Sequence, residues 1–519
     1  MKVSTLFLVL ASLGFSQTAP RPAFEAADIH ASAKVAYPGM RGPLVRGERY
    51  QVKDATLLDL ISTAYNLPAD RVQGGPAWLN TDRFDILAKV AAGSTSASSK
   101  QMLQALLEDR FRLAAHTDTR PLDAYSLTVG KGKPKLKEAS GQGAPGCDRK
   151  GDNGDEYIEM TCRNETMEML AQLIRGVEVP AELRTIPVVD STGLQGAFDF
   201  DFKWTSRQQR ALGQQAIPLA DALDKQLGLK LAPGKTPLEV LVIDSVSQKP
   251  ADNPPDTAAK LPPPLPATFE VAEIRPSRPD AQTRARFSNG RLDAEGIPLN
   301  ELIKAAWNID SDDLIANMPK FTDSAKFDVV AKVSTDPKIA AEVDDDTLLE
   351  MVKALLVERF KLATHMEDRQ VSTYTLTPAK PKLLKANPNN RSECKEGPGA
   401  DGKDPRVANP QLNRLFSCFN TTMGQFADML PARMNGYIRS PVRDETGLTD
   451  AYDFTLSFSG TNVLSRLNAR GNPDGASEPN GALSLFEAIN KQMGLKLELQ
   501  KRTAQVLVVD HVEEKPVDN

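Results

Sequence analysis

The sequence predicts an α+β fold made of two homologous domains in tandem, each built from repeated units of one helix and one β-hairpin. Two observations lead to this fold class. Long phrases of the 519-residue chain occur twice in the same order, and in each copy amphipathic helical stretches are followed by two strand-like runs. Because short helices cannot bury an apolar face alone, we expect the helices to cover antiparallel sheets.

The clearest repeat runs from Met102 to Leu136 and returns from Glu350. Its apolar residues recur at i, i+3, i+4 and i+8, the spacing of a helix with one buried face. They are Leu103, Leu106, Leu107 and Phe111 in the first copy, and Val352, Leu355, Leu356 and Phe360 in the second. Self-similarity of this kind indicates duplicated architecture and says little about chemistry.

Four helix–strand–strand units are predicted in each half, with insertions confined to the loops between them. In the first half, helices are expected near 56–67, 102–111, 166–174 and 219–227. The strand pairs expected after them are 70–75 with 83–90, 113–117 with 124–129, 185–190 with 196–204, and 228–231 with 240–244. We predict that the two strands of each pair form an antiparallel hairpin. In the second half, Thr422 and Gln425 are spaced for a capping box at the start of a helix.

The domain boundary is expected in the segment 249–266, whose prolines favour an extended, semi-rigid spacer without a core of its own. We therefore place domain 1 at residues 22–248 and domain 2 at 267–516. Residues 1–19 have one early positive charge, a short apolar run and small residues, as a secretory signal peptide does. That run is too short for a permanent membrane span. The mature chain is expected to be periplasmic or extracellular, without an integral membrane segment.

The composition excludes some partners. The net charge is −5, with 25% charged and 40% hydrophobic residues, which is typical of a soluble globular protein. No basic block is longer than the segment 131–137. A nucleic acid or an anionic membrane surface is therefore not expected as a partner.

The four cysteines occupy matching places in the two halves. In an oxidising compartment they indicate two disulfides, Cys147–Cys162 and Cys394–Cys418. A loop of about 15 residues closed in this way stabilises a fold by roughly 3 kcal/mol. The alternative, a metal site, lacks C-x-x-C spacing and nearby histidines. We expect no metal and no cofactor.

His116 and His365 occupy equivalent positions, and so do Arg110 and Arg359. A histidine can act as a base, a metal ligand or a pH sensor. Since no second histidine lies near either one in the sequence, we favour a strand histidine that packs and makes one hydrogen bond. The arginines are expected to bond helix-end carbonyls or a carboxylate rather than a ligand.

Asp190 and Asp444 each stand in a V-x-D-x-T-G-L phrase, and Asp199 and Asp453 follow in the next strand. Paired carboxylates can do acid–base work or hold a cation. Asp, Thr and Gly before a strand are also what a turn requires, and we favour the turn.

Trp78 lies beside Gly74 and Gly75 in a loop that resembles a binding loop. The equivalent loop keeps the proline and an aromatic residue but loses both glycines, so a turn with a packed aromatic side chain is favoured. The segment 141–146 matches G-x-G-x-x-G literally. It follows no clear strand and opens no helix, so it is not interpreted as a nucleotide-binding loop.

Several phrases together resemble a known family. They are GGPAWLNTDRFDILAK (74–89), LLEDRFRLAAH (106–116), VVDSTGLQGAFDF (188–200), and QLGLKL (226–231) followed by VLVID (240–244). The chain resembles the acidobacterial duplicated orphan family, which comprises uncharacterised exported proteins of soil bacteria with a domain of unknown function. The same domain is also found joined to membrane-bound peptidases like those of antibiotic-sensing receptors. The resemblance therefore implies an extracytoplasmic sensing or binding role, and it carries over no catalytic residues.

Two functional hypotheses follow. The first is an exported binding or interaction module without catalytic activity, which uses sheet edges or the cleft between the halves. Its partner would be a cell-envelope protein or a small ligand. The second is an envelope hydrolase with an unrecognised site built from Asp190, Asp199 and His116, or from their equivalents. That site requires the three groups to converge within hydrogen-bond reach, about 3 Å.

Overall fold

The computed structural model describes residues 21–33, 38–150, 157–176, 187–205, 217–468 and 481–517, except positions 279, 310, 400, 410, 435 and 439. The predicted signal peptide, residues 1–19, lies outside the described residues. A content of 27% helix and 39% strand fits the predicted mixed α+β class. Within the described ranges, no helix is long and apolar enough to cross a membrane.

The chain folds as two halves with the same topology, half 1 with strands β1–β12 and half 2 with strands β13–β24. Each half has three four-stranded sheets, and every strand order of half 1 recurs in half 2. No strand pairing in the part of the chain that the structure describes joins the two halves. The duplication in the sequence is therefore a duplication of topology.

The first sheet of each half, with its helices, forms a unit that we call the N-lobe. In half 1 the strand order is β1 (Ala26–Ala31), β5 (Arg83–Lys89), β3 (Arg49–Thr56) and β2 (Arg41–Arg46), with helices α1 (Leu57–Tyr65) and α2 (Ser96–Phe111). In half 2 the strand order is β13 (Val271–Pro276), β17 (Lys326–Lys332), β15 (Arg291–Pro298) and β14 (Arg284–Ser288). The helices of this lobe are α8 (Leu299–Ala306), α9 (Phe321–Ser324), α10 (Pro337–Glu342) and α11 (Asp345–Arg359). In each N-lobe, helices and sheet contribute apolar side chains to one core.

The second sheet of each half forms the C-lobe. In half 1 it consists of β7 (Lys137–Glu138), β11 (Phe198–Trp204), β9 (Ile158–Glu165) and β8 (Gly146–Lys150). Its helices are α3 (Met167–Gly176) and α6 (Leu219–Ala222), which continues as the π-helical turn η3 (Leu223–Leu227). In half 2 the strands are β19 (Leu384–Lys385), β23 (Ala451–Phe458), β21 (Arg414–Thr422) and β20 (Glu393–Glu396). The helical segments there are α12 (Pro405–Ala408), α13 (Met423–Arg433), α14 (Thr461–Asn468), α15 (Leu485–Ala488) and η5 (Ile489–Met493).

One disulfide lies in each C-lobe. Cys147–Cys162 joins β8 to β9, and Cys394–Cys418 joins β20 to β21, with sulfur–sulfur distances of 2.01 and 2.02 Å. The predicted pairing is therefore confirmed. The predicted capping box is confirmed as well, because Thr422 Oγ1 accepts from Gln425 N and Gln425 Oε1 accepts from Thr422 N.

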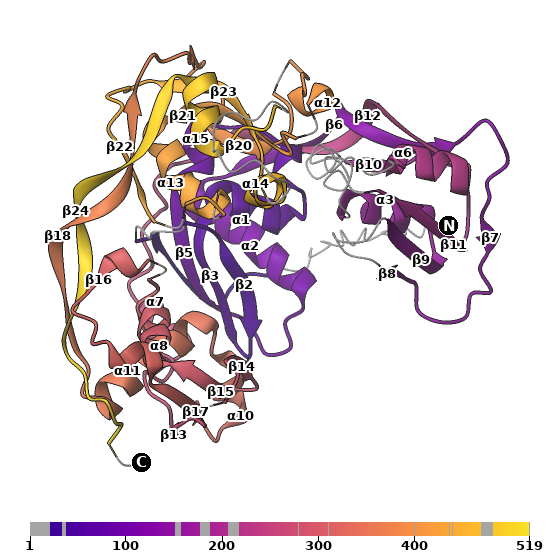
Figure 1. The fold of residues 1–519 in the computed structure, drawn as a ribbon. Helices are drawn as coiled ribbons and strands as arrows, with labels where there is room; N and C mark the ends of the chain where they lie inside the picture. The colour runs from indigo at the N-terminus through magenta and orange to yellow at the C-terminus, as the bar shows by residue number, and fades with distance from the viewer. Residues whose placement is uncertain are drawn as a thin grey trace, which may run out of the picture.

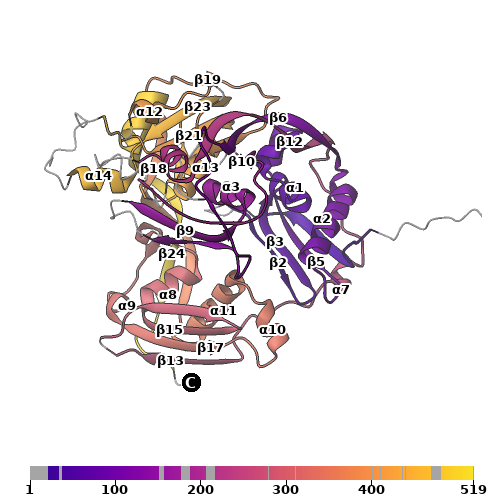
Figure 2. The ribbon, with the colours of Figure 1, turned by 90° about the vertical axis from the view of Figure 1, so that its right-hand side faces the viewer.

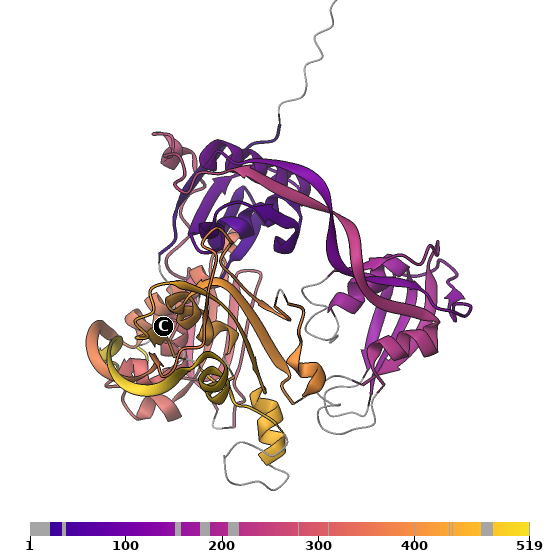
Figure 3. The ribbon, with the colours of Figure 1, turned by 90° about the horizontal axis from the view of Figure 1, so that it is seen from above.

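A long antiparallel ribbon connects the two lobes of each half. It is formed by β6 (Ala114–Val129) with β12 (Leu229–Ser245) in half 1, and by β18 (Ala363–Pro378) with β24 (Leu495–His511) in half 2. Short parallel strands flank its opposite ends: β4 (Val72–Gly74) and β10 (Val188–Asp190), or β16 (Ile315–Ala316) and β22 (Val442–Asp444). Figure 3 shows the ribbon of half 1 arching from its N-lobe to its C-lobe.

The predicted hairpins are wrong, although their strands exist. β4 and β5 lie in different sheets, as do β10 and β11. The runs 113–117 and 124–129 belong to the single strand β6, and 228–231 and 240–244 belong to β12. Alternating hydrophobicity identifies a strand and its buried face, but it does not identify the partner strand. The eight units are therefore not self-contained.

Prolines lie within the long ribbon strands of half 1. Pro121 faces Pro237, and Pro233 faces Tyr125, in the middle of the ribbon of half 1. A proline normally breaks a central strand because it cannot donate to the ladder. Here the middle of the ribbon has only two strands, so each strand keeps an open edge where a missing N–H is tolerated. Sequence signals typical of turns therefore lie within continuous strands.

The two halves are docked asymmetrically. In Figure 1 the N-lobe of half 1, with α1, α2, β3 and β5, stands between the two lobes of half 2. Figure 2 shows the same N-lobe above the N-lobe of half 2 and beside its C-lobe. Contacts on both sides support this arrangement: Arg49 with Glu342 of the N-lobe, and Arg391 of the C-lobe with Ala69. Half 2 therefore holds the N-lobe of half 1 from two directions.

Candidate functional site

The contact between the two N-lobes is ionic. Lys53 of β3 places its Nζ 3.3 Å from Asp344 Oδ2 and 3.0 Å from Asp346 Oδ2. Arg41 Nε lies 3.4 Å from the same oxygen of Asp346. Arg49 Nε lies 3.3 Å from Glu342 Oε2, and its side chain is only 6% exposed. A basic sheet face of half 1 thus meets the acidic start of α11. We call this set of residues the junction contact.

Backbone groups tighten the junction contact. Arg46 Nη1 donates to the carbonyl oxygen of Val343, and Arg49 Nη2 donates to that of Pro263. A Cβ at Gly47 would lie 2.5 Å from Glu342 Oε1, so the two halves approach closely here. Asp344 is also the N-cap of α11, where its Oδ1 accepts from Thr347 N at 2.8 Å. Negative charge at a helix start is favoured by the helix dipole.

The electrostatics of Asp344 reflect both roles. Burial on its own raises the pKa of this carboxyl, but the hydrogen bonds from Thr347 and the charge of Lys53 outweigh burial and lower the pKa overall. The charged form is therefore stabilised by the docked arrangement.

Residues at equivalent positions of the two halves show that this contact is specialised. Glu295 is the fifth residue of β15, and the fifth residue of the equivalent strand β3 is Lys53. Glu295 forms an ion pair with Arg284 of its own sheet. The N-cap of α2 is Thr95 where α11 has Asp344. Half 2 therefore lacks the lysine of the basic face, although Arg284 and Arg291 stand at the positions of Arg41 and Arg49. Half 1 lacks the acidic helix start. The same contact therefore cannot form with the roles of the two halves exchanged.

A cavity of about 710 Å³ lies between half 1 and the C-lobe of half 2. We call it the junction cavity. Half 1 supplies Ala31, Ser32, Ala33, Pro38, Asp54, Thr81, Asp82, Arg83, Phe84, Gln248, Lys249 and Pro250, and half 2 supplies Asp428, Pro431, Pro441 and Val442. Its volume is in the range of small-molecule sites in proteins.

The polar groups of the junction cavity are held in place by their neighbours. Arg83 Nη1 donates to the carbonyl oxygen of Asp54 at 2.5 Å and lies 3.6 Å from Asp54 Oδ2. Gln248 Nε2 donates to Asp82 Oδ2 at 2.7 Å. Phe84 and the four prolines supply a rigid apolar wall. The cavity therefore combines apolar surface with a few fixed polar groups, as ligand sites do.

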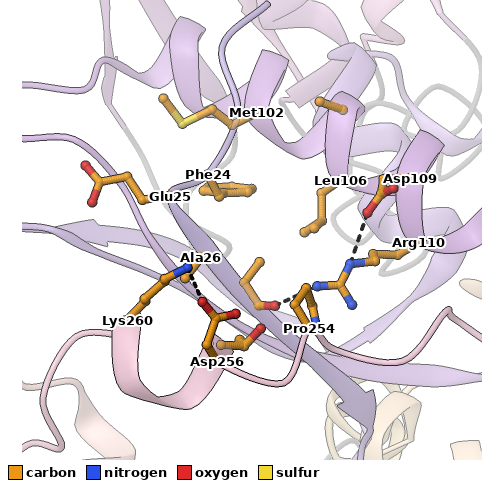
Figure 4. A pocket seen from close by; sticks show the side chains of 14 residues that line it. Phe24, Glu25, Ala26, Met102, Leu106, Asp109, Arg110, Pro254, Asp256 and Lys260 are labelled. Carbon is orange, nitrogen blue, oxygen red and sulfur yellow. Dashed lines mark hydrogen bonds and ion pairs between the residues drawn. The ribbon is translucent and has the colours of Figure 1, made fainter.

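A second cavity, of about 650 Å³, lies beside the junction contact, but many of its polar groups already form that contact. A smaller cavity of about 360 Å³ lies between α2, β1 and the interdomain linker. Figure 4 shows Phe24, Met102 and Leu106 on its apolar side and the pairs Asp256–Lys260 and Asp109–Arg110 at its charged side.

The structure places Arg110 at the wall of this smaller cavity. Its Nη1 donates to the carbonyl oxygens of Ala251 and Asp252 and to Asn253 Oδ1, at 3.0–3.2 Å. Its Nη2 donates to the carbonyl oxygen of Ala27 at 3.0 Å. The side chain thus fastens the start of the linker to β1. The linker also contains a helical turn, α7 (Thr257–Lys260), within the spacer predicted at 249–266.

The segment after the ribbon is held in the same way in half 2. Ala251 N donates to the carbonyl oxygen of Arg110, and Val517 N donates to that of Arg359, at 2.7 and 2.8 Å. Arg359 also lies 3.4 Å from Glu358. Both arginines therefore occupy a helix end that anchors the segment following the last strand.

Both candidate histidines pair with an aspartate across the ribbon. His116 Nδ1 lies 2.9 Å from Asp244 Oδ2, and His365 Nδ1 lies 2.8 Å from Asp510 Oδ2. The rings are half-exposed. Sequence reasoning missed these partners, although both aspartates end the repeated V-L-V-x-D run. The sequence did contain a signal for the pairing, because the histidine and the aspartate are both present at equivalent positions of the two halves.

The postulated hydrolase site does not assemble. Asp190 pairs with Leu127 of β6, whereas His116 lies eleven positions earlier on that strand. At about 3.3 Å per residue this separation is tens of ångströms. Asp199 Oδ1 accepts from Asn164 N, and Asp453 Oδ1 accepts from Asn420 N. Asp190, Asp199 and His116 therefore do not converge as the postulated site requires.

Asp190 and Asp444 cap equivalent turns. Asp190 Oδ1 accepts from the backbone N and the hydroxyl of Thr192, and Asp444 Oδ1 does the same for Thr446. Trp78 lies in the 3-10 turn η2 (Ala77–Asn80) and packs against the N-lobe core. Among the residues that the structure describes, no group of three His, Cys, Asp or Glu side chains could hold a metal ion.

The family model described as "Protein of unknown function (DUF3738)" matches the chain twice, at residues 58–246 and 300–512. The chain belongs to this DUF3738 family. No curated protein and no solved structure matches it. The acidobacterial origin implied by the sequence resemblance stays a prediction.

Each structural half is larger than the DUF3738 match inside it. The first match begins in α1, after β1–β3, and the second begins in α8, after β13–β15. Those strands nevertheless complete the N-lobe sheet of each half. Lys53, one of the cations of the junction contact, therefore lies outside the first DUF3738 match, whereas Asp344 and Asp346 lie inside the second.

We predict that Lys53 and Asp346 stabilise the fold jointly. In a double-mutant cycle with Lys53→Ala and Asp346→Ala, the coupling in the free energy of unfolding should be about 0.5–1 kcal/mol, because this pair is partly shielded from solvent. Urea denaturation measures it. The exposed ribbon pair Lys235–Asp123 is the matched control and should give a coupling near zero. Equal couplings would show that the junction contact contributes no more than a surface pair.

We also predict a pH dependence that comes from Asp344. Its pKa is lowered in the folded state, so its charge stabilises the fold above the ordinary carboxyl pKa of about 3.9, and this contribution is lost as the pH falls through the lowered pKa. Asn at this position keeps a good N-cap without the charge. The wild type should therefore be more stable than Asp344→Asn near neutral pH, and the difference should shrink on acidification. A difference that is constant with pH would contradict this assignment.

Proposed function

We propose that this chain is a binding module without catalytic activity whose ligand occupies the junction cavity. The observation that carries the proposal is a cavity of small-molecule size walled by both halves, with apolar surface and fixed polar groups together. A cavity of this kind is the default binding-site hypothesis for an uncharacterised structure. The separation of His116 from Asp190 further favours binding over hydrolysis.

The lining indicates the type of ligand. Phe84, Pro431 and Pro441 offer a rigid apolar surface that loses little entropy when it is covered. Lys249 offers positive charge, whereas Arg83 is already paired with Asp54. Asp82, which Gln248 orients, and Asp428 offer acceptors. A compact molecule with an apolar body and one anionic or hydrogen-bonding group fits this combination.

The occupancy of the cavity is tested with the dye 1-anilinonaphthalene-8-sulfonate, which has an apolar body and one anionic group. We expect its fluorescence to rise on binding to the wild type. Ala33 is an exposed residue just after β1 that lines the cavity, so Ala33→Trp places a large side chain in the cavity. This variant should bind the dye about tenfold more weakly or worse, which corresponds to a loss of at least about 1.4 kcal/mol. Ala97→Trp, on the exposed start of α2, is the control and should bind as the wild type does. Equal binding by both variants would refute the junction cavity as the site.

We further propose that the chain acts outside the cytoplasm. This proposal is supported by the signal-like residues 1–19 and by the two disulfides, since such bonds persist in oxidising compartments. On expression with its first residues intact in a bacterium with a periplasm, we expect a product in the periplasm or the medium whose N-terminus begins after the signal. Mass spectrometry of the fractionated protein measures this. A full-length product confined to the cytoplasm with four reduced cysteines would contradict export.

A further inference from the structure

A group of charged side chains lies where half 1 meets the C-lobe of half 2, and it shares no residue with the junction cavity. Arg391, just before β20, reaches across to the turn η1 (Ala69–Arg71) of half 1. There its Nη2 donates to the carbonyl oxygen of Ala69 at 3.4 Å. The next two residues of that turn are Asp70 and Arg71.

Charges from three lobes gather around Asp70. Its carboxyl interacts electrostatically with Arg71 of its own turn, with Arg175 of α3 and with Glu393 of β20. Arg391 in turn interacts with Asp70 and Glu393. Glu393 is also 3.6 Å from Lys395 Nζ. Asp70 therefore interacts with three arginines, and Glu393 interacts with Arg391 and Lys395.

Two guanidinium nitrogens in this group are buried without a hydrogen-bond partner, Arg71 Nε and Arg391 Nη1. Burial lowers the pKa of the Arg391 guanidinium, which is partly exposed, whereas Asp70 lies at the surface. A buried donor without a partner is unfavourable, because it loses its bond to water and gains none in return. These donors are suited to an acceptor that is not part of the chain.

The duplicated half shows that the fold does not require these arginines. Arg71 precedes β4, and its equivalent before β16 is Leu314. Arg391 lies three residues before Cys394, and Ala144 lies three residues before Cys147. Arg175 lies eight residues after the first residue of α3. The residue at the same place in the equivalent helix α13 is Pro431. The same architecture is thus built elsewhere with apolar residues at all three positions.

We propose that Arg71, Arg175 and Arg391 form a binding site for a small oxyanion, a phosphate, sulfate or carboxylate group. Guanidinium groups match such anions well, because their planar donors can form paired, charge-assisted hydrogen bonds. The site joins both lobes of half 1 to the C-lobe of half 2, so a bound oxyanion stabilises their docked arrangement.

The proposal is tested by thermal unfolding of the full chain in phosphate, sulfate or acetate, each compared with chloride at the same ionic strength. We expect at least one oxyanion to raise the melting temperature above the chloride value, because a ligand that binds the native state stabilises it. Phosphate and sulfate also stabilise proteins without binding, because they are excluded from the surface. Only the part of the effect that is lost in the arginine variants below therefore counts, and it identifies a tetrahedral anion for phosphate and sulfate or a carboxylate for acetate. Equal effects of all four salts would overturn the proposal.

The matched variants are Arg71→Leu and Arg391→Ala, which introduce the residues of the equivalent positions. Each should weaken oxyanion binding by about tenfold, the effect of one lost charge-assisted bond, without lowering the melting temperature in chloride. Lys235→Ala on the ribbon is the control and should respond to the anion as the wild type does. Variants that respond like the wild type would overturn the proposal.

A measurement on the wild type guards against variants that fail to fold. Phosphorus NMR of inorganic phosphate should show line broadening on addition of the protein, and excess sulfate should reverse it. Absence of broadening together with no thermal effect would overturn the proposal. Neither experiment uses the dye that reports on the junction cavity, so the two sites stand or fall separately.

Discussion

The arrangement of the two halves depends on the junction contact. In it, basic residues of β2 and β3 attract acidic residues at the end of α10 and the start of α11. Lys53, Arg41 and Arg49 meet Asp344, Asp346 and Glu342 at 3.0–3.4 Å in a region partly shielded from water. Partial burial matters here, because exposed ion pairs contribute little to stability. Together with the hydrogen bond from Arg391 to Ala69, this contact holds half 1 against half 2. The junction cavity and the group of Arg71, Arg175 and Arg391 both depend on that arrangement, because each takes residues from both halves.

The duplication acts as an internal control for what the fold requires. Features present in both halves, such as the Asp190 and Asp444 turns and the disulfides, serve the architecture. Features present in one half only, such as Lys53, Asp344 and Arg391, belong to the contact between the halves. Divergence after duplication therefore concentrated charge at the places where one copy meets the other.

The sequence alone predicted the elements better than their partners. The helical stripe around Leu103 and Phe111, the disulfides and the capping box of Thr422 depend on local patterns or on cysteine spacing, and all three are confirmed. The hairpins failed because partner choice is decided by packing across the whole half. The His116–Asp244 pair joins residues far apart in the chain. The junction cavity has no local signal at all, since four stretches of half 1 and two of half 2 contribute to it.

The central claim is that the two halves form one docked body held by charge. Small-angle X-ray scattering of the wild-type protein, at about 0.15 M and about 1 M salt, tests it most directly, because the range of electrostatic attraction falls from about 8 to about 3 Å between these conditions. The account predicts a profile at the lower salt that matches the docked structure, and a larger radius of gyration at the higher salt. A profile of two independently oriented halves at the lower salt would contradict it.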